Sequence, residues 1–76
     1  MDWRSRKYYA ATFSIEAQDM RIRHLKLIGN GVKIHFGRDT YLCIIGCNTD
    51  QCDAVEYELR KAERNDDYCM WKEIKR

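Results

Sequence analysis

The stretch 25–36 constrains the fold most, because it places Asn-Gly between two runs in which apolar and polar residues alternate. A type I′ hairpin turn requires a positive φ at both central residues, and Asn30 and Gly31 tolerate that conformation better than other residue types. A hairpin with its tip at this dipeptide has one apolar face for the core and one polar face for water. The predicted cross-strand pairs are Gly29 with Val32, Leu27 with Ile34, and Leu25 with Phe36, and the outer face carries Lys26, Lys33 and His35.

Alternating residues predict further strands on both sides of this hairpin. In 7–16 apolar and polar side chains alternate from Tyr9 onward, and 40–46 is apolar at both parities, as is usual for an interior or covered strand. Arg21 and Arg23 share the core-facing parity of the second strand, so we expect them to reach water where the sheet ends. We predict a four-stranded, mostly antiparallel sheet in meander order, with strands at about 7–16, 20–29, 31–37 and 40–46.

A helix is predicted after the fourth strand. The segment 46–50 interrupts the strand pattern and contains Asn, Thr and Asp, whose side chains accept the unpaired amide protons of a first helical turn. Apolar residues then recur at three- and four-residue spacing over 55–62, which predicts a helix at about 50–64 packed on one face of the sheet. For 67–75 we favour a strand over a short helix, because its residues prefer strands. The predicted fold class is α+β, with 1–76 as a single domain.

Composition and length narrow the class of protein. A hydrophobic content of 45% with 34% charged residues is typical of a globular chain. A chain of 76 residues has little room for a deep, water-excluding active site, and no catalytic or cofactor motif is found. We therefore expect a protein without enzymatic activity, catalytic residues or cofactor, although Cys47 with a histidine is one possible nucleophile and base. No apolar run suits a membrane span or signal peptide, so the expected location is the cytoplasm, with no membrane partner.

The cysteines raise the question of metal binding. Three of them are spaced C-x3-C-x4-C, which differs from the C-x2-C spacing that grips zinc from a tight turn. We expect buried thiols and no metal site, because free cysteine is among the most buried residue types. A site completed by Cys69 or a histidine, or two disulfides in a secreted chain, are the alternatives. The four residues are Cys43, Cys47, Cys52 and Cys69.

The charges are unevenly distributed along the chain. Residues 1–38 carry eight Lys and Arg against three acids, a balance of +5, whereas 39–76 carry six against nine, a balance of −3. Such an asymmetry orients a charged partner during encounter.

Two features predict a surface that binds a macromolecule. Lysine and arginine on the outer face of a sheet suit phosphates, and aromatic rings suit either base stacking or the anchoring of a protein interface. The chain also has more large aromatic residues than a core of this size absorbs. We interpret the acidic residues of 50–67 as a solvated helix face, and His24 and His35 as exposed residues of the outer sheet face. The predicted partner-binding residues are Trp3, Arg4, Tyr8, Lys26, Lys33, His35, Arg38 and Trp71.

These observations favour a small, non-enzymatic protein that docks on a macromolecule. The first expectation is a protein–protein interaction module, for example an inhibitor of a host nuclease or polymerase of the kind that viruses and mobile elements produce. The alternative is a nucleic-acid-binding protein that uses the basic outer face of the sheet. A homodimer is also possible, because a second chain would cover a strand that is apolar on both faces.

Overall fold

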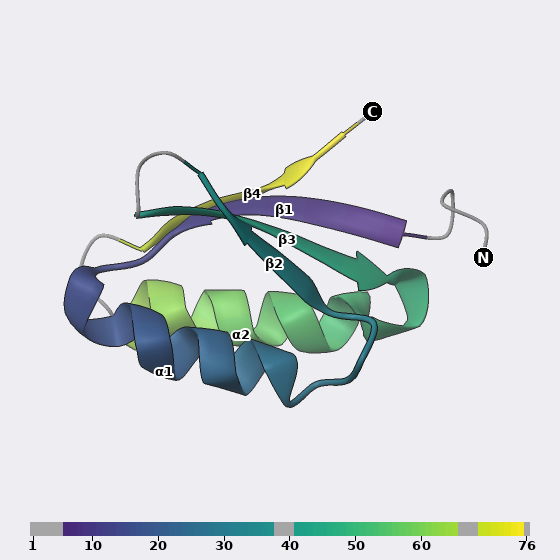
Figure 1. The fold of residues 1–76 in the computed structure, drawn as a ribbon, viewed down its shortest axis with the longest axis horizontal. Coiled ribbons are helices and arrows are strands. Elements are labelled where there is room, and N and C mark those ends of the chain that lie inside the picture. Colours follow the sequence, from purple (N-terminus) through teal and green to yellow (C-terminus); the bar gives the residue numbers. More distant parts are fainter. Residues whose placement is uncertain (1–5, 38–40, 66–68, 76) are drawn as a thin grey trace.

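A computed structural model describes residues 6–37, 41–65 and 69–75. Within these ranges the order of elements is β1 (Arg6–Thr12), α1 (Ile15–Lys26), β2 (Lys33–Phe36), β3 (Leu42–Asn48), the short 3₁₀ helix η2 (Thr49–Gln51), α2 (Cys52–Asn65) and β4 (Met70–Ile74). Figure 1 shows that the strands form one layer and the helices a second layer.

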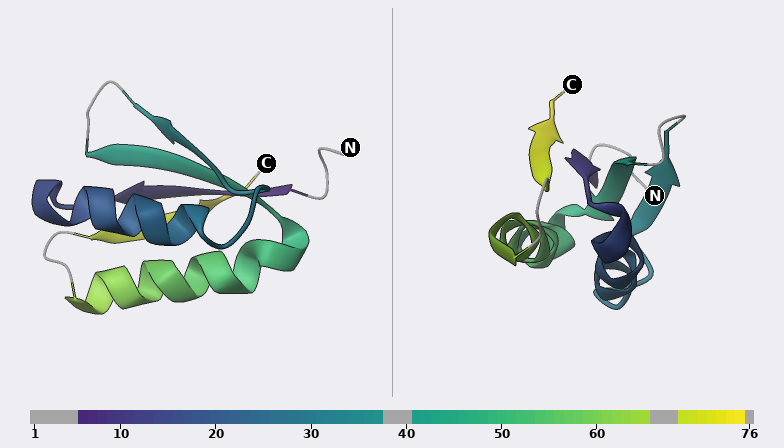
Figure 2. Two further views of the ribbon diagram at one scale, coloured as in Figure 1. Left: turned by 60° about the horizontal axis from the view of Figure 1, so that its bottom comes forward. Right: turned by 90° about the vertical axis from the view of Figure 1, so that its left-hand side faces the viewer.

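The four strands form one antiparallel sheet in the order β2-β3-β1-β4. Both helices lie on the same side of it, and the opposite side bears no helix among the described residues (Figures 1 and 2). The β-α-β-β-α-β order with β1 and β3 in the centre is the ferredoxin-like, split βαβ arrangement. The prediction of an α+β domain with a four-stranded antiparallel sheet and a packed helix is confirmed.

The predicted strand at 20–29 is wrong, because this part of the chain lies mainly in helix α1. The Ser14 side chain starts the helix, where its Oγ accepts a hydrogen bond of 3.3 Å from the Ala17 backbone amide. Ala17, Arg21 and Leu25 are buried at four-residue spacing, the period of a helix face. Arg21 was expected to reach water, but its side chain is only 4% exposed, so this prediction is wrong.

Asn30-Gly31 lies in the loop between α1 and β2 and is not the tip of a hairpin. Gly31 is needed there for close packing, because a Cβ at this position would contact the side chains of Asn48 and Gln51. The predicted pairs across the turn are therefore wrong: Ile34 lies opposite Ile45, and Phe36 lies opposite Cys43.

The meander order is also wrong. Strand β1 pairs with β3 and β4, which are distant in the sequence, and only β2 and β3 are consecutive neighbours. Helix α1 occupies the place of the expected second strand. It connects β1 to β2, which lies at the edge of the sheet and is separated from β1 by β3.

The other predicted elements are present, but the strand predicted at 7–16 ends at Thr12, because the Ser14 cap starts α1 at Ile15. Helix α2 buries Cys52, Val55, Leu59 and Ala62, and the C-terminal segment forms a strand, as favoured. On β3 the core-facing parity is that of Cys43, Ile45 and Cys47, which the sequence left open.

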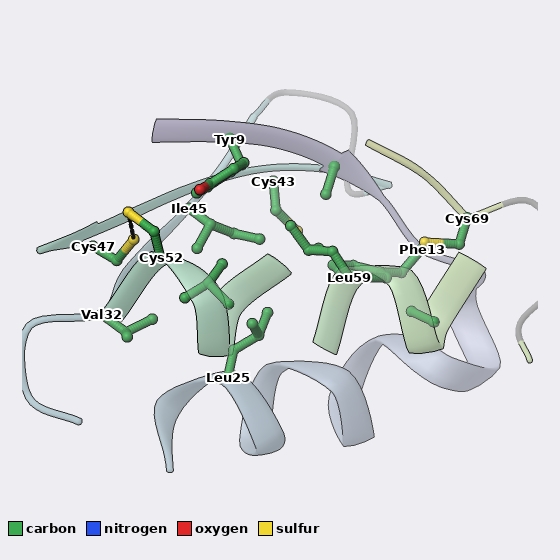
Figure 3. Packing of buried hydrophobic residues seen from close by; sticks show 13 residues of the cluster. Tyr9, Phe13, Leu25, Val32, Cys43, Ile45, Cys47, Cys52, Leu59 and Cys69 are labelled. Carbon is green, nitrogen blue, oxygen red and sulfur yellow. Dashed lines mark hydrogen bonds between the residues drawn. The ribbon is translucent and has the colours of Figure 1, made fainter. Parts of the chain in front are cut away.

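The core lies between the sheet and the helices (Figure 3). Tyr9 and Phe13 at the β1 side and Leu59 of α2 have exposed fractions of 2% or less. The Tyr9 hydroxyl donates a 2.5 Å hydrogen bond to Glu56 Oε2, so the phenol reaches a polar partner at the edge of the apolar core. All four cysteines are buried free thiols, as expected.

Candidate functional site

The candidate site is the side of the sheet that faces away from the helices. Directly paired residues of antiparallel strands lie on the same face, so the pairing of the strands assigns the side chains of this surface. We call this surface the open face. Its described residues are Arg6, Tyr8, Ala10 and Thr12 of β1, Lys33 and His35 of β2, Leu42, Ile44, Gly46 and Asn48 of β3, and Met70, Lys72 and Ile74 of β4.

The open face is basic. It carries Arg6, Lys33 and Lys72 together with His35, and none of its described residues is an Asp or Glu. The helices α1 and α2 together carry six Lys and Arg and six Asp and Glu, so their formal charges cancel. The net positive charge of the described sheet residues therefore lies on the open face, which no described helix covers.

The Tyr8 ring lies against the backbone of Gly46. The two residues are directly paired across β1 and β3, and a Cβ at Gly46 would lie 2.9 Å from Tyr8 Cε1 and 3.2 Å from Tyr8 Cδ1. Real Cβ atoms do not approach so closely, so the glycine is what allows the ring to lie over the neighbouring strand. The result is that an aromatic side chain of the central strand β1 covers the backbone of β3 on the open face.

Arg6 is held in place beside this ring. Its Nη1 donates to Asn48 Oδ1 at 3.0 Å, and its Nη2 donates to the backbone oxygen of Gly31 at 3.0 Å. A guanidinium has five N–H donors in a fixed plane, so these two bonds orient the group and leave donors for a ligand. Arg6 therefore links β1, the end of β3 and the loop before β2.

A hollow of about 460 Å³ lies next to the Tyr8 ring. We call it the basic hollow; its lining residues are Arg6, Tyr8, Asn30, Gly31, Lys33, His35 and Gly46. It is bounded by β1, β2, β3 and the loop after α1, so the fold brings together residues up to 40 positions apart, from Arg6 to Gly46. Its lining combines the Tyr8 side chain with the polar or charged side chains of Arg6, Asn30, Lys33 and His35.

A second hollow, of about 310 Å³, lies on the β4 side of the open face. Its lining residues are Ala10, Thr12, Leu42, Met70, Trp71 and Lys72. Met70 is 73% exposed and Leu42 is 37% exposed, so this side is apolar and accessible. The open face thus combines a basic, aromatic part with an apolar part.

The structure brings together three of the predicted partner-binding residues, namely Tyr8, Lys33 and His35. Lys26 was expected on the outer face of a strand, but it lies at the end of α1 in the helix layer. Trp71 faces the helix side of β4, where its ring is 6.0 Å from that of Tyr9 at 62°, and it is half-buried. The remaining predicted residues, Trp3, Arg4 and Arg38, lie outside the described residues.

Arg6, Lys72 and Gly46 are not among the predicted partner-binding residues. Lys72 was not singled out because the C-terminal strand had no assigned position in the sheet, and Gly46 was interpreted only as the end of a strand. Lys72 lies opposite Ala10 of β1, and this pairing assigns Lys72 to the open face. The assignment requires the register of β4 with β1, which the sequence did not supply. No local pattern in the sequence indicates that Gly46 is paired with Tyr8.

The two histidines do not share a face, contrary to the prediction. His35 is on the open face, whereas His24 is on α1 with its Nδ1 3.6 Å from Glu58 Oε1 of α2. Cys47 faces the core, on the side of the sheet opposite His35, so these two do not form a nucleophile and base pair. Within the described ranges, no group of three or more His, Cys, Asp or Glu is arranged to hold a metal ion.

Comparison with family models, with curated proteins and with solved structures found no match. No helix in the described part of the chain is long and apolar enough to cross a membrane. The class that the fold defines is a small ferredoxin-like α+β domain with an uncovered, basic sheet face.

Proposed function

We propose that this protein binds single-stranded nucleic acid on the open face of its sheet. The observation that carries the proposal is the Tyr8 ring, which lies over Gly46 and beside the oriented guanidinium of Arg6. Proteins that bind single strands combine aromatic rings, on which bases stack, with cations that contact the backbone. A base stacked on Tyr8 lies next to the basic hollow, where Arg6 and Lys33 are in reach of its phosphates.

The charges of the open face support a polyanionic ligand. Lys33 and Lys72 stand on the two edge strands, and Arg6 is at the start of the central strand β1. A backbone that crosses the sheet from β2 to β4 spans about 14 Å between the outer strand axes, at about 4.8 Å a strand, and meets cations at both edges. None of the described residues of this face is a carboxylate that would repel a phosphate.

The experiment is a fluorescence anisotropy titration of labelled oligothymidine and oligouridine with the full chain. We expect saturable binding that weakens with salt, and weaker binding of a duplex whose bases are already stacked. Tyr8→Ala should weaken binding between about 5- and 150-fold, because stacking on an aromatic residue contributes about 1–3 kcal/mol per base. Tyr57→Ala is the matched control, because Tyr57 is 64% exposed on α2. An unchanged affinity of the Tyr8 variant would contradict the proposal.

The second candidate is a protein-docking function, which the apolar part of the open face favours. Met70 and Leu42 line its hollow, and Met70 is 73% exposed. Absence of oligonucleotide binding, together with a protein complex that survives moderate salt and is lost in Met70→Asp, would favour this candidate. Inhibition of a nuclease or polymerase, and a cytoplasmic location, stay predictions.

A further inference from the structure

Two buried cysteines lie side by side at one end of the core. Cys47 is in β3, Cys52 is the first residue of α2, and their Sγ atoms are 3.9 Å apart (Figure 3). Cys47 has an exposed fraction of 0% and Cys52 one of 6%. The two cysteines are separated only by residue 48 and the short helix η2, so both thiols belong to one local turn.

We propose that Cys47 and Cys52 are a modification site, at which a hydroperoxide converts the two thiols into a reversible intramolecular disulfide. The Sγ atoms have to close from 3.9 Å to about 2.05 Å. Both residues are joined through η2, which has a single turn, so small side-chain rotations and a shift of this turn suffice. The proposal is independent of the proposed nucleic-acid binding.

The chemistry proceeds in two balanced steps. The thiolate of Cys52, the more exposed of the two, attacks one oxygen of hydrogen peroxide, the O–O bond breaks, and a sulfenic acid and water form. The thiolate of Cys47 then attacks Cys52 Sγ, the S–S bond forms, the S–O bond breaks, and the hydroxide leaves as water with the proton from Cys47. Two thiols and one peroxide thus give one disulfide and two water molecules, and a dithiol reductant reverses the reaction.

The surroundings of Cys47 make the second step slow near neutral pH. Burial, with a smaller contribution from Cys52, raises the pKa of Cys47 to about 12. The other ionisable groups that act on it are Arg6 of β1, which opposes this shift, and Glu56 of α2, which adds to it. The reactive thiolate is therefore scarce at pH 7, and disulfide formation should accelerate about tenfold per pH unit in mildly alkaline solution.

Oxidation has a defined structural effect on the turn. The Cys52 thiol donates a hydrogen bond of 3.6 Å to the backbone oxygen of Asn48, and a disulfide sulfur has no proton for this bond. Asn48 Oδ1 also accepts the hydrogen bond from Arg6, and the Asn48 backbone N–H donates to Gln51 Oε1 at 3.1 Å. The disulfide therefore replaces one thiol contact of this turn by a covalent link.

The test is treatment of the full chain with hydrogen peroxide, followed by alkylation in denaturant and intact mass spectrometry. We expect the loss of two hydrogen atoms, two fewer alkylated thiols, and recovery of both by dithiothreitol. Cys47→Ala and Cys52→Ala should abolish the loss. Cys43→Ala is the matched control and should retain it, because Cys43 is also buried on the core side of β3 but lies about 13 Å from Cys47 along the strand.

Peptide mapping of the unsubstituted chain keeps the test valid if a cysteine variant fails to fold. Cleavage before Asp50 and Asp53 separates Cys47 from Cys52, so their disulfide joins two peptides. Cys43 lies in the same 39–49 peptide as Cys47, so fragmentation of the linked pair is used to identify which of the two is bonded to Cys52. No mass loss, a disulfide that involves Cys43 or Cys69, or a disulfide between chains would overturn the proposal.

Discussion

Tyr8 and Gly46 are directly paired across β1 and β3, and the ring of the first lies where a side chain of the second would be. The position of the ring therefore depends on a residue that contributes no side chain. This dependence can be measured without removing any group from the site.

Gly46→Ala should displace the Tyr8 ring and weaken oligonucleotide binding by several-fold. The added Cβ would lie 2.9 Å from Tyr8 Cε1, which the ring can relieve only by moving. In the double variant with Tyr8→Ala, Gly46→Ala should cause a smaller further loss, because the ring is absent and only the 3.1 Å approach of the added Cβ to Arg6 Nη2 remains. Anisotropy titrations of the four proteins give this coupling, and additive effects of the two substitutions would count against the described role of Gly46.

The salt dependence of binding should report the cations of the open face. Each phosphate contact contributes about 0.7 to the slope of log affinity against log salt for a single strand. Lys33→Gln and Lys72→Gln should each lower the magnitude of the slope by about that amount, since both lie on the open face. Lys61→Gln, an exposed substitution on α2, is the matched control. A slope that is the same in all variants would show that these lysines do not contact phosphates.

Ser14→Ala should destabilise the fold by about 0.5–2 kcal/mol, because the Ser14 side chain caps α1. Ser14→Asp should retain most of the stability, since a carboxylate also accepts from the first-turn amides and suits the helix dipole. Urea unfolding followed by circular dichroism measures both. Equal stability of the Ala and Asp variants would argue against a helix beginning at this residue.

Leu59→Ala should cost about 2–5 kcal/mol, because its side chain is fully buried between α2 and the sheet. Tyr57→Ala on the same helix should change stability by no more than about 0.5 kcal/mol, since this ring is exposed. The comparison keeps helix propensity and position similar, so the difference measures burial. Similar costs for the two variants would contradict the described face of α2.

Stability should fall in alkaline solution, and Tyr9 should contribute to this fall. Burial, followed by the hydrogen bond to Glu56, raises the pKa of Tyr9 above its usual range. Above about pH 10 the unfolded chain releases this proton while the folded chain retains it, so the stabilisation is present below that pH and is lost as the pH rises further. Burial also raises the pKa of Cys43 and Cys47, which gives the same sign from about pH 8.5.

Tyr9→Phe should therefore lower stability at neutral pH by about 1 kcal/mol through the lost hydrogen bond. Above about pH 10 the free energy of unfolding of Tyr9→Phe should fall less steeply than that of the unsubstituted chain, by about 1.4 kcal/mol per pH unit. Urea titrations between about pH 8 and 11 test this, with Tyr57→Phe as the control. A decline of the same steepness in Tyr9→Phe and the unsubstituted chain would refute the assignment.

The spacing of apolar residues within a single segment was enough to predict α2 and β1. The three- and four-residue spacing of Val55, Leu59 and Ala62 identified α2, and the alternation around Tyr9 identified β1 and its two faces. Lys33 and His35 were correctly assigned to the outer face because β2 keeps the parity expected for the second arm of the hairpin.

The errors arose where a tertiary contact decides the conformation. Asn30-Gly31 matches a hairpin turn, but Gly31 serves the close approach of Asn48 and Gln51, which are distant in the sequence. The same holds for the pairing of Tyr8 with Gly46, which joins strands 38 positions apart. The helix cap at Ser14 was present in the sequence, but the alternation that begins at Tyr9 included Ser14 in the strand predicted at 7–16.

The strand order has a consequence for how the domain assembles. The central strand β1 pairs only with β3 and β4. In the second of these pairings, Thr12 lies opposite Met70, which is distant in the sequence. The polypeptide must therefore close long loops before the first strand gains either neighbour, and such non-local closure slows folding. We expect this domain to fold in milliseconds or longer rather than in microseconds.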